Sequence, residues 1–407
     1  MEYRYFYIMF IFFVFFEFFI FTLVKIFKKK FQWLVTKEDE FPFNKQNEID
    51  YFLKNSFSKN LGWDRKPGTK GVELLGDSKT KFEINRHGFR KSNNKYKENL
   101  ITVFGDSYAF CRYVNDDSTW EHYLEKKIKK EVRNYGVGNY GIDQALIKFD
   151  KTNINKKCKI IFLVFVPETI SRIHSYWKHY SEFGNKFGFK PIFKFKKKRL
   201  IKIDNFLTKY QKINQIKKNI NKIKKNDLFY KTKFQKRIFK FPYSICYLKN
   251  FKINNSIFFN LSLFYLLKIF LSEKNNKFFN RAILTIIKKN ILDTYKMYTK
   301  VEYTNLFLEI IKNYDKKIKK KKIKLVLIVI PQKIDVLNAK KQRLSYESFF
   351  EELKSKYSLL DLTMDFVRKK NIDEMYVTDN YAGHLSKKGN NFIASKIAKF
   401  LKKEVKI

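Results

Sequence analysis

The 407-residue chain contains few cysteines and lacks the polar composition of a disordered tail. Its three cysteines, Cys111, Cys158 and Cys246, are odd in number and widely spaced, which excludes a disulfide scaffold and a cysteine-rich zinc site. Because 44% of the residues are hydrophobic and 18% are aromatic, the apolar material is sufficient for one large domain or two modest ones.

Acidic residues are also scarce, with 39 against 86 basic residues and a formal net charge of +47. Such a charge suits a nucleic-acid or anionic-membrane partner. However, only 12 of the basic residues are Arg, and Lys, Asn, Ile, Phe and Tyr, which share A/T-rich codons, are abundant together. Base composition therefore explains the charge better than nucleic-acid binding, for which bidentate Arg contacts are typical. We expect no specific nucleic-acid partner, and a polybasic surface binder is the alternative.

One long stretch near the start of the chain is almost without charge. Residues 5–24 contain nine phenylalanines and a single charged residue, Glu17. At 1.5 Å per residue this stretch crosses the ~30 Å hydrocarbon layer of a bilayer. A cleavable signal peptide is the alternative, but the stretch is long for one and no small-residue cleavage site follows it. We interpret residues 1–30 as an uncleaved transmembrane anchor with a basic flank, so that a membrane is the expected partner.

The charges beside this anchor bear on which side of the membrane the rest of the chain lies. Only Arg4 and the amino terminus precede the apolar stretch, whereas four lysines follow it within residues 25–30. The positive-inside rule therefore favours a cytoplasmic C-terminal part. A glycan-modifying function would favour the periplasmic or extracellular side, so both locations stay open.

The rest of the chain predicts an α/β protein. Residues 31–98 contain short stretches broken by glycines and Pro67, which indicates a small β-rich lead-in. From residue 99 to residue 407, strand-like and helical segments alternate, which predicts a parallel sheet covered by helices on both faces. The expected strands are 100–104, 132–135, 159–166, 324–330 and 359–362. The expected helices are 118–130, with a capping box of Ser118 and Glu121, 142–149 and 387–401.

The alternation is absent between residues 178 and 322. Lys, Asn, Ile and Phe recur there at helical spacing, so we predict a mainly helical insertion. Within it, residues 257–267 are apolar but too few to span a bilayer, and indicate a core helix or an interfacial contact.

The sequence Gly-Asp-Ser at residues 105–107 directly follows the first expected strand. A serine at that position lies at the carboxyl edge of a parallel sheet, where open α/β folds place their sites. The N–H groups of the helix that follows can hold an oxyanion. Gly-Asp-Ser recurs at residues 76–78, but there it follows no core strand. Position therefore favours Ser107 as a nucleophile over Ser78.

Two further motifs come later in the chain. Residues 134–144 place three glycines in a strand-to-helix loop, which permits close backbone approach to a ligand or, alternatively, only a tight turn. Residues 383–390 precede the last helix and contain His384, and the other histidines lie at or before residue 179. A nucleophilic serine needs a base, and histidine is the usual one at neutral pH.

The order of these three motifs resembles the SGNH (GDSL-like) hydrolase superfamily. Residues 105–107 match its nucleophile block, residues 134–141 look like its oxyanion block, and residues 384–390 resemble its histidine block. The resemblance covers roughly residues 84–403 apart from the insertion. It implies a flavodoxin-like α/β/α sandwich and ester hydrolysis or acyl transfer, with Ser107 as nucleophile and His384 as base. We expect no metal and no cofactor.

Two departures from the family pattern affect the site. The family acid commonly lies two or three residues before the histidine, where this chain has Ala382 and Tyr381. Asp379, five residues before, is the candidate acid, and a Ser–His dyad is the alternative. The family's asparagine block after the third strand is replaced by residues 166–172 (VPETISR), where Glu168 or a backbone N–H is the candidate substitute. The candidate oxyanion donors are the Ser107 N–H, Gly138 and Asn139.

These observations favour a membrane-anchored serine esterase that acts on an acylated carbohydrate or a similar ester. A sugar O-acyltransferase on the same fold is the first alternative, because it differs only in the acceptor. The missing asparagine suggests a second alternative, a non-catalytic binding protein on a degraded hydrolase fold.

Overall fold

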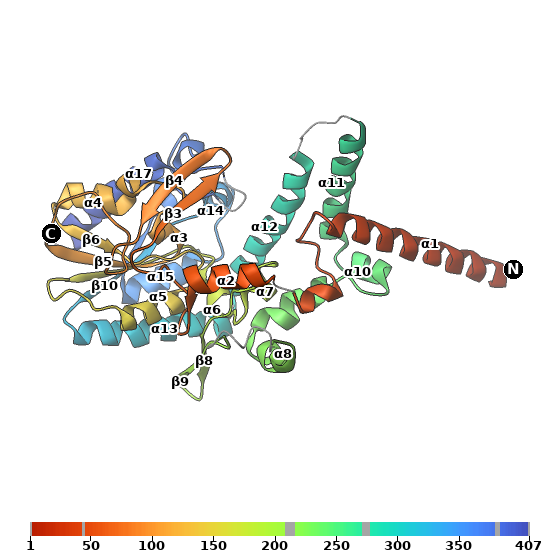
Figure 1. Cartoon of the computed structure of the whole chain (residues 1–407), viewed down its shortest axis with the longest axis horizontal. Coiled ribbons are helices and arrows are strands. Elements are labelled where there is room, and N and C mark those ends of the chain that lie inside the picture. Colours follow the sequence, from red (N-terminus) through yellow and green to blue (C-terminus); the bar gives the residue numbers. More distant parts are fainter. Residues whose placement is uncertain (1, 43–44, 208–215, 271–276, 379–382, 406–407) are drawn as a thin grey trace. The chain divides into compact units, whose positions relative to one another are not determined.

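The computed structural model describes residues 2–42, 45–207, 216–270, 277–378 and 383–405 (Figure 1). The chain forms two compact units. The sheet unit comprises Ile49–Tyr176, Lys190–Tyr210 and Ile291–Ile407, and the helical unit comprises Met1–Glu48, Trp177–Phe189 and Gln211–Asn290. This division does not test the domain limits predicted from the sequence, which stay predictions.

A five-stranded parallel sheet organises the sheet unit. Its strands are β5 (Asn99–Gly105), β6 (Glu131–Asn134), β7 (Ile160–Phe165), β10 (Lys324–Val329) and β11 (Ser358–Asp361). The spatial order is β11-β10-β7-β5-β6, which is 2-1-3-4-5 when these strands are numbered along the chain. That is the flavodoxin-like order, in which the strand order reverses between the first and third strands. The predicted fold class and all of the predicted strands are confirmed.

Helices cover both faces of this sheet, which gives three layers (Figure 1). One face packs on α4 (Trp120–Ile128), α16 (Thr363–Val367) and α17 (Lys387–Phe400). The other packs on α5 (Ile142–Lys151), α13 (Val301–Lys320) and α15 (Glu347–Lys356). Every residue of β5 and β7 is buried, as expected for parallel strands between two helical layers.

The cap of α4 differs from the prediction. Ser118 lies in η2 (Asp116–Ser118), where its hydroxyl donates to Asp117 Oδ1 at 2.8 Å. Thr119 is the N-cap instead, and its side chain accepts from the His122 N–H at 3.1 Å. The capping-box prediction was therefore wrong by one residue, because two adjacent hydroxyl residues compete for the position.

The described part of the lead-in contains a short 3₁₀ helix, η1 (Lys37–Glu40), then one α-helix and two antiparallel hairpins. Its other elements are α2 (Gln46–Asn55), whose first residues belong to the helical unit, β1 (Phe57–Ser58), β2 (Gly62–Trp63), β3 (Lys70–Leu75) and β4 (Ser78–Glu83). The second Gly-Asp-Ser sequence forms the turn between β3 and β4. Gly76 has a left-handed φ of +55° there, and Ser78 is exposed. This copy of the tripeptide is a hairpin turn.

The region predicted as a mainly helical insertion also contains a β-hairpin, β8 (Ile192–Lys196) with β9 (Arg199–Ile203). Lys197 and Lys198 join the two strands with φ values of 48° and 59°. Asn and Gly are the usual residues for such a turn, so the sequence carried no hairpin signal. The remaining short elements of the sheet unit are α3 (Ser107–Phe110), α6 (Thr169–Ile173), α14 (Lys333–Ala339), η5 (Asp373–Met375) and η6 (Leu401–Val405).

The helical unit is built around the end of its first helix, α1 (Glu2–Lys28). Its other elements are η1 (Lys37–Glu40), α7 (Lys178–Ser181), α8 (Ile216–Asn226), η4 (Tyr230–Phe234), α9 (Gln235–Arg237), α10 (Tyr243–Lys249), α11 (Phe251–Phe270) and the first part of α12 (Lys277–Met297). Ile20, Val24 and Phe27 of α1 are buried in one cluster with residues of α11 and α12. Residues 257–267 were predicted to form either a core helix or an interfacial contact. Ile257, Phe258 and Leu261 belong to that cluster, as a core helix requires. Residues Tyr3–Lys28 of α1 are long and apolar enough to cross a membrane.

Candidate active site

Ser107 lies at the turn between β5 and α3, at the point where the strand order of the sheet reverses. Asp106 caps α3, and its Oδ1 accepts from the Tyr108 N–H at 2.8 Å. A Cβ on Gly105 would lie 2.1 Å from the Val164 carbonyl oxygen, so only glycine permits this approach of β5 to β7. The serine is therefore held on a tight turn, at the place where open α/β sheets bind ligands.

His384 is the partner of Ser107. Its Nε2 lies 2.9 Å from Ser107 Oγ, although 277 residues separate the two along the chain. With the ring proton on Nδ1, Nε2 accepts a hydrogen bond from the serine hydroxyl, which is the arrangement a general base requires. Ser107 and His384 are 5% and 7% exposed. The structure thus brings together the two residues that the sequence proposes as nucleophile and base.

Two aromatic rings hold the imidazole in place. The Tyr108 ring stacks on His384 at 4.9 Å between centroids, and the Tyr113 ring contacts it edge-on at 5.4 Å. The Tyr108 hydroxyl also donates to the Gly383 carbonyl at 2.5 Å, so the residue next to Ser107 positions both the His384 ring and the backbone before it. Neither tyrosine is predicted from the sequence as part of the site, although Tyr108 directly follows the Gly-Asp-Ser motif.

The candidate acid, Asp379, lies outside the described residues, as do Tyr381 and Ala382. Backbone hydrogen bonds join the described residues on the two sides of this segment, next to η5. The Val377 N–H donates to the His384 carbonyl at 2.8 Å, and the Ser386 N–H donates to the Met375 carbonyl at 2.9 Å. The choice between a triad and a dyad stays a prediction.

A buried ion pair supports the turn at Ser107, which we call the nucleophile turn after the role predicted for this serine. Asp106 Oδ2 accepts from Arg172 Nη1 and from the Val166 N–H, both at 3.2 Å. Burial raises the pKa of the Asp106 carboxyl, and the Arg172 guanidinium and the two backbone N–H groups act against that rise. Because the same Arg172 nitrogen also donates to the Tyr140 carbonyl at 3.1 Å, one guanidinium joins the nucleophile turn to the glycine loop.

Arg172 belongs to the VPETISR segment that replaces the family's asparagine block. Glu168, the candidate substitute for that asparagine, accepts from Arg172 Nη2 at 2.7 Å. The structure therefore gives Glu168 a partner within its own segment. Arg172 is a supporting residue that sequence analysis did not identify, although it lies in the segment that marked the departure from the family.

The glycine loop that carries Gly138 and Asn139 lies next to the nucleophile turn, because the Val137 N–H donates to the Gly105 carbonyl at 3.0 Å. Asn139 has a left-handed φ of +66°, and a Cβ on Gly138 would meet no heavy atom within 4 Å. The loop therefore has open space beside Gly138. Donation by Gly138 and Asn139 to an oxyanion stays a prediction.

Residues of the lead-in form hydrogen bonds with this loop and with the segment after α3. The Trp63 indole donates to the Gly138 carbonyl at 2.9 Å, and the Tyr140 hydroxyl donates to the Trp63 carbonyl at 2.6 Å. Arg90 donates to the carbonyls of Phe110, Cys111 and Val114 at 2.5 to 2.8 Å. Cys111 and Tyr113 both have left-handed φ values in this segment, so Arg90 stabilises a strained backbone that presents Tyr113 to His384.

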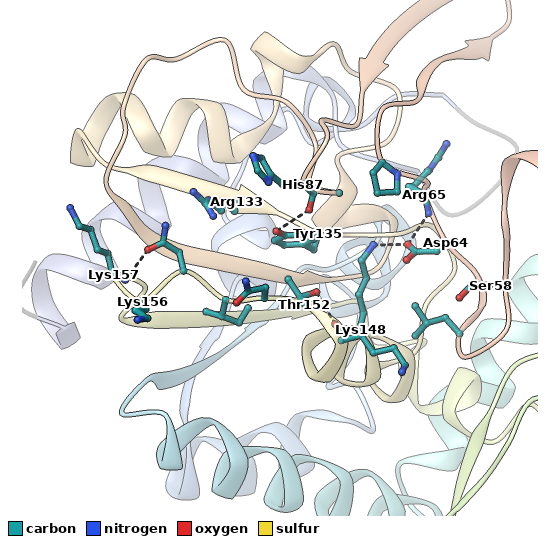
Figure 2. Close-up of a pocket in the computed structure, with 17 residues that line it drawn as sticks. Ser58, Asp64, Arg65, His87, Arg133, Tyr135, Lys148, Thr152, Lys156 and Lys157 are labelled. Atoms are coloured by element: carbon teal, nitrogen blue, oxygen red, sulfur yellow. Dashed lines mark hydrogen bonds and ion pairs between the residues drawn. The ribbon is translucent and has the colours of Figure 1, made fainter.

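A cavity of about 730 Å³ lies elsewhere in the sheet unit, between the lead-in and β6 (Figure 2). Its lining does not include Ser107 or His384. Its basic side chains include Arg65, Arg133 and Lys148, which are paired with Glu73, Glu131 and Asp64, respectively. Because carboxylates already neutralise these three cations, we interpret the cavity as a seam between the lead-in and the sheet. Among the described residues, no three His, Cys, Asp or Glu side chains are grouped to hold a metal ion.

Comparison with known proteins adds little to this geometry. No family model matches the chain, and no curated protein matches it. A solved structure from Desulfitobacterium hafniense DCB-2, assigned to the G-D-S-L family of lipolytic proteins, is similar at 11% identity and a TM-score of 0.35. The match covers 74% of this chain and 99% of that one. A likeness of this extent carries no functional argument, so the function rests on the site itself.

Proposed function

We propose that this chain is a membrane-anchored serine esterase of the SGNH type, in which Ser107 is the nucleophile and His384 the general base. The observation that carries the proposal is the 2.9 Å contact between Ser107 Oγ and His384 Nε2 at the carboxyl edge of the sheet. A serine hydroxyl is a weak nucleophile until a base within hydrogen-bond reach accepts its proton. The substrate class is an acyl ester, with an acylated carbohydrate as the first candidate.

The reaction follows from these two groups. Ser107 Oγ attacks the acyl carbon while His384 Nε2 takes the hydroxyl proton, and the carbonyl oxygen becomes an oxyanion beside the Ser107 N–H. The imidazolium then gives its proton to the departing alkoxide, which leaves as an alcohol, and the acyl group stays on Ser107. Water attacks this acyl-enzyme, His384 takes a proton from the water, and that proton returns to Ser107 Oγ as the carboxylic acid departs.

The membrane part of the proposal rests on α1. Its residues 3–15 are exposed and apolar apart from Arg4, which is stable in a lipid environment but costly in water. Membrane anchoring would hold the esterase beside lipid-linked or surface-attached substrates.

Acyl transfer to a sugar hydroxyl is the second candidate. Ser107 and His384 are both almost fully buried, which favours a site that excludes water from the acyl-enzyme. An acceptor other than water then competes better for the acyl group.

The test compares Ser107→Ala with Ser78→Ala, which changes the second Gly-Asp-Ser copy in an exposed turn. The purified full chain is assayed with a chromogenic acetyl ester and is labelled with a serine-directed phosphonate. We expect Ser107→Ala to lose both turnover and labelling, and Ser78→Ala to retain both. Equal labelling of Ser107→Ala and the unchanged chain would contradict the assignment of the nucleophile.

A second arm separates hydrolysis from transfer. Soluble oligosaccharides are added to the chromogenic assay, and the products are analysed by mass spectrometry. A rise in alcohol release together with acylated sugar supports transfer, whereas free acid alone supports hydrolysis. An unchanged chain that neither turns over the ester nor reacts with the phosphonate would support the non-catalytic alternative.

A further inference from the structure

The helical unit exposes apolar side chains beside α1 as well as on it. α10 and the residues that flank it carry four large apolar side chains with exposed fractions between 42% and 75%: Phe241, Ile245, Leu248 and Phe251. These residues belong to one short segment, residues 240–252. We call this segment the collar.

The collar is fastened to the middle of the apolar stretch of α1. Glu17, the single acidic residue of that stretch, accepts hydrogen bonds from the N–H groups of Tyr243 and Ser244 at 2.5 and 2.7 Å. Two ring contacts continue this pairing, Phe21 with Tyr243 and Phe16 with Tyr247. The first turn of α10 therefore lies at the level of Glu17.

The length of α1 before Glu17 determines where the lipid would end. Residues 3–16 are the part before Glu17, and they extend roughly 21 Å at 1.5 Å per residue. A hydrocarbon layer is ~30 Å thick, so an anchor that spans it continues about 9 Å beyond this part. Phe18 and Phe19 are 67% and 56% exposed, so α1 still presents apolar side chains at the level of the collar.

The collar has the composition of a segment at a membrane surface. Lys240, Lys249 and Lys252 are exposed and lie near the two ends of the segment, beside its apolar residues. Long lysine side chains can reach the phosphate level while neighbouring apolar side chains enter the acyl region. The Glu17 bonds also satisfy two N–H groups of α10 that would otherwise be unpaired in a medium without water.

We propose that the collar lies in the membrane interface around α1, with Phe241, Ile245, Leu248 and Phe251 in the acyl region and its lysines on anionic headgroups. The partner is an anionic phospholipid surface. The proposal rests on the membrane anchoring proposed for α1 and does not depend on the esterase chemistry. A second copy of the chain is the competing occupant of this surface.

The chain contains its own reporter for this proposal. Cys246 lies in α10 and is partly exposed, whereas Cys111 and Cys158 are buried. An environment-sensitive fluorophore on Cys246 of the full chain is therefore placed within the collar. The labelled chain is reconstituted into vesicles of phosphatidylcholine and phosphatidylglycerol, and association is checked by flotation. Iodide reports exposure to water, and lipids that carry a spin label near the headgroup or near the chain end report depth.

We expect the label to lose iodide quenching and to be quenched more strongly by the shallow spin label than by the deep one, as for a segment about 5–10 Å below the headgroups. Two references calibrate the scale, both in a Cys246→Ser background. Phe13→Cys in α1 gives the deep reference, and Lys354→Cys in α15 gives the aqueous one.

Three outcomes would overturn the proposal, each differently. A chain that floats while the Cys246 label stays open to iodide keeps the anchor but removes the collar from the membrane. A label protected from iodide and also from both spin-labelled lipids indicates coverage by protein, such as a second copy. A chain that does not float removes the anchor and the collar together. Ester turnover of the same preparation is measured separately and distinguishes these outcomes from a failure of the esterase assignment.

Discussion

The two units use the same apolar residue types, but these side chains are buried in the sheet unit and largely exposed along α1 in the helical unit. In the sheet unit, every residue of β5 and β7 is buried between two layers of helices. In the helical unit, α1 is exposed over residues 3–15 and becomes buried only at Ile20, Val24 and Phe27. A helix that is apolar on all faces and has no covering partner is stable only in an apolar solvent. The sheet unit therefore builds its own core, whereas residues 3–15 of α1 leave an apolar surface that the proposed membrane anchoring would cover.

Both units also fix the start of a helix with a carboxylate. Asp106 accepts from the Tyr108 and Val166 N–H groups and so builds the turn of the nucleophile. Glu17 accepts from the Tyr243 and Ser244 N–H groups and so fastens α10 to α1. In the sheet unit these hydrogen bonds shape the turn of the proposed nucleophile, whereas in the helical unit they join the proposed anchor to α10. Changes in one unit should therefore leave the function of the other intact.

The largest expected effect comes from shortening the chain. A chain that begins at Phe31 loses Ile20, Val24 and Phe27 from the helical core, at a cost of about 5–9 kcal/mol for three buried apolar side chains. We expect residues 216–270 to become sensitive to protease while ester turnover persists. A chain that begins at Phe16 keeps these contacts and Glu17, so it should stay protease-resistant but be released from membranes by alkaline carbonate. Equal protease resistance of the two chains would remove α1 from the helical core.

The next effect concerns the base and its acid. His384→Ala should lower ester turnover by about 10⁴- to 10⁶-fold with little change in membrane association, because no other group lies at hydrogen-bond distance to accept the Ser107 proton in the described structure.

Asp379→Asn should lower turnover by ~10⁴-fold if Asp379 orients the imidazole, and should cost little if the site is a dyad. Parallel pH–rate profiles of the two variants check this. Near-unchanged Asp379→Asn beside inactive His384→Ala would remove Asp379 from the site.

Local patterns explain how much of the sheet unit could be predicted. Parallel strands buried on both faces appear as continuous apolar runs. The strand predicted at residues 159–166 therefore agrees with β7 to within one residue at each end. The turn at Ser107 was found because a small Gly-Asp-Ser motif directly follows such a run. His384 was found because few histidines exist and one lies before the last helix.

Contacts between distant segments explain what could not be predicted. Arg90 holds carbonyls 20 to 24 residues further along the chain, and Arg172 joins Asp106 to Tyr140 from a segment that matched no motif. In the sequence Glu17 is recognisable only as the single charged residue of the apolar stretch, because its partners lie 226 and 227 residues away. A single sequence contains no signal for such pairs, since each partner is an ordinary polar residue or backbone group.

A third prediction tests the ion pair beneath the nucleophile. Arg172→Met leaves the buried Asp106 carboxylate without its cation, so we expect a loss of about 3–5 kcal/mol in the free energy of unfolding of the sheet unit. Turnover should fall as well, because the nucleophile turn and the Tyr140 carbonyl lose their common donor. Arg343→Met is the matched control, since Arg343 is exposed and its ion pairs are worth about 1 kcal/mol or less.

Adding Asp106→Asn to Arg172→Met distinguishes the pair from simple loss of packing. The neutral amide removes the unpaired charge, so the double variant should recover part of the lost stability. Urea unfolding followed by near-ultraviolet circular dichroism measures both steps. Additive losses in the double variant would show that Arg172 acts through packing rather than through Asp106.

An effect that appears only as pH rises concerns Glu121 on α4, which is buried and accepts from the Cys111 thiol at 3.0 Å. Burial raises the pKa of this carboxyl from 4.5 to about 8. The folded chain therefore keeps the proton at pH values where the unfolded chain releases it, so the free energy of unfolding falls as pH rises from about 4.5 to about 8. The slope is about 1.4 kcal/mol per pH unit at most. Glu121→Gln is neutral at every pH, so we expect it to match the unchanged chain near the acid end and to exceed it increasingly as pH rises, by up to about 5 kcal/mol near pH 8. Glu352→Gln, on the exposed face of α15, should leave the slope unchanged. Urea midpoints across this pH range measure the difference, and parallel curves for the unchanged chain and Glu121→Gln would show that Glu121 is ionised in the folded core.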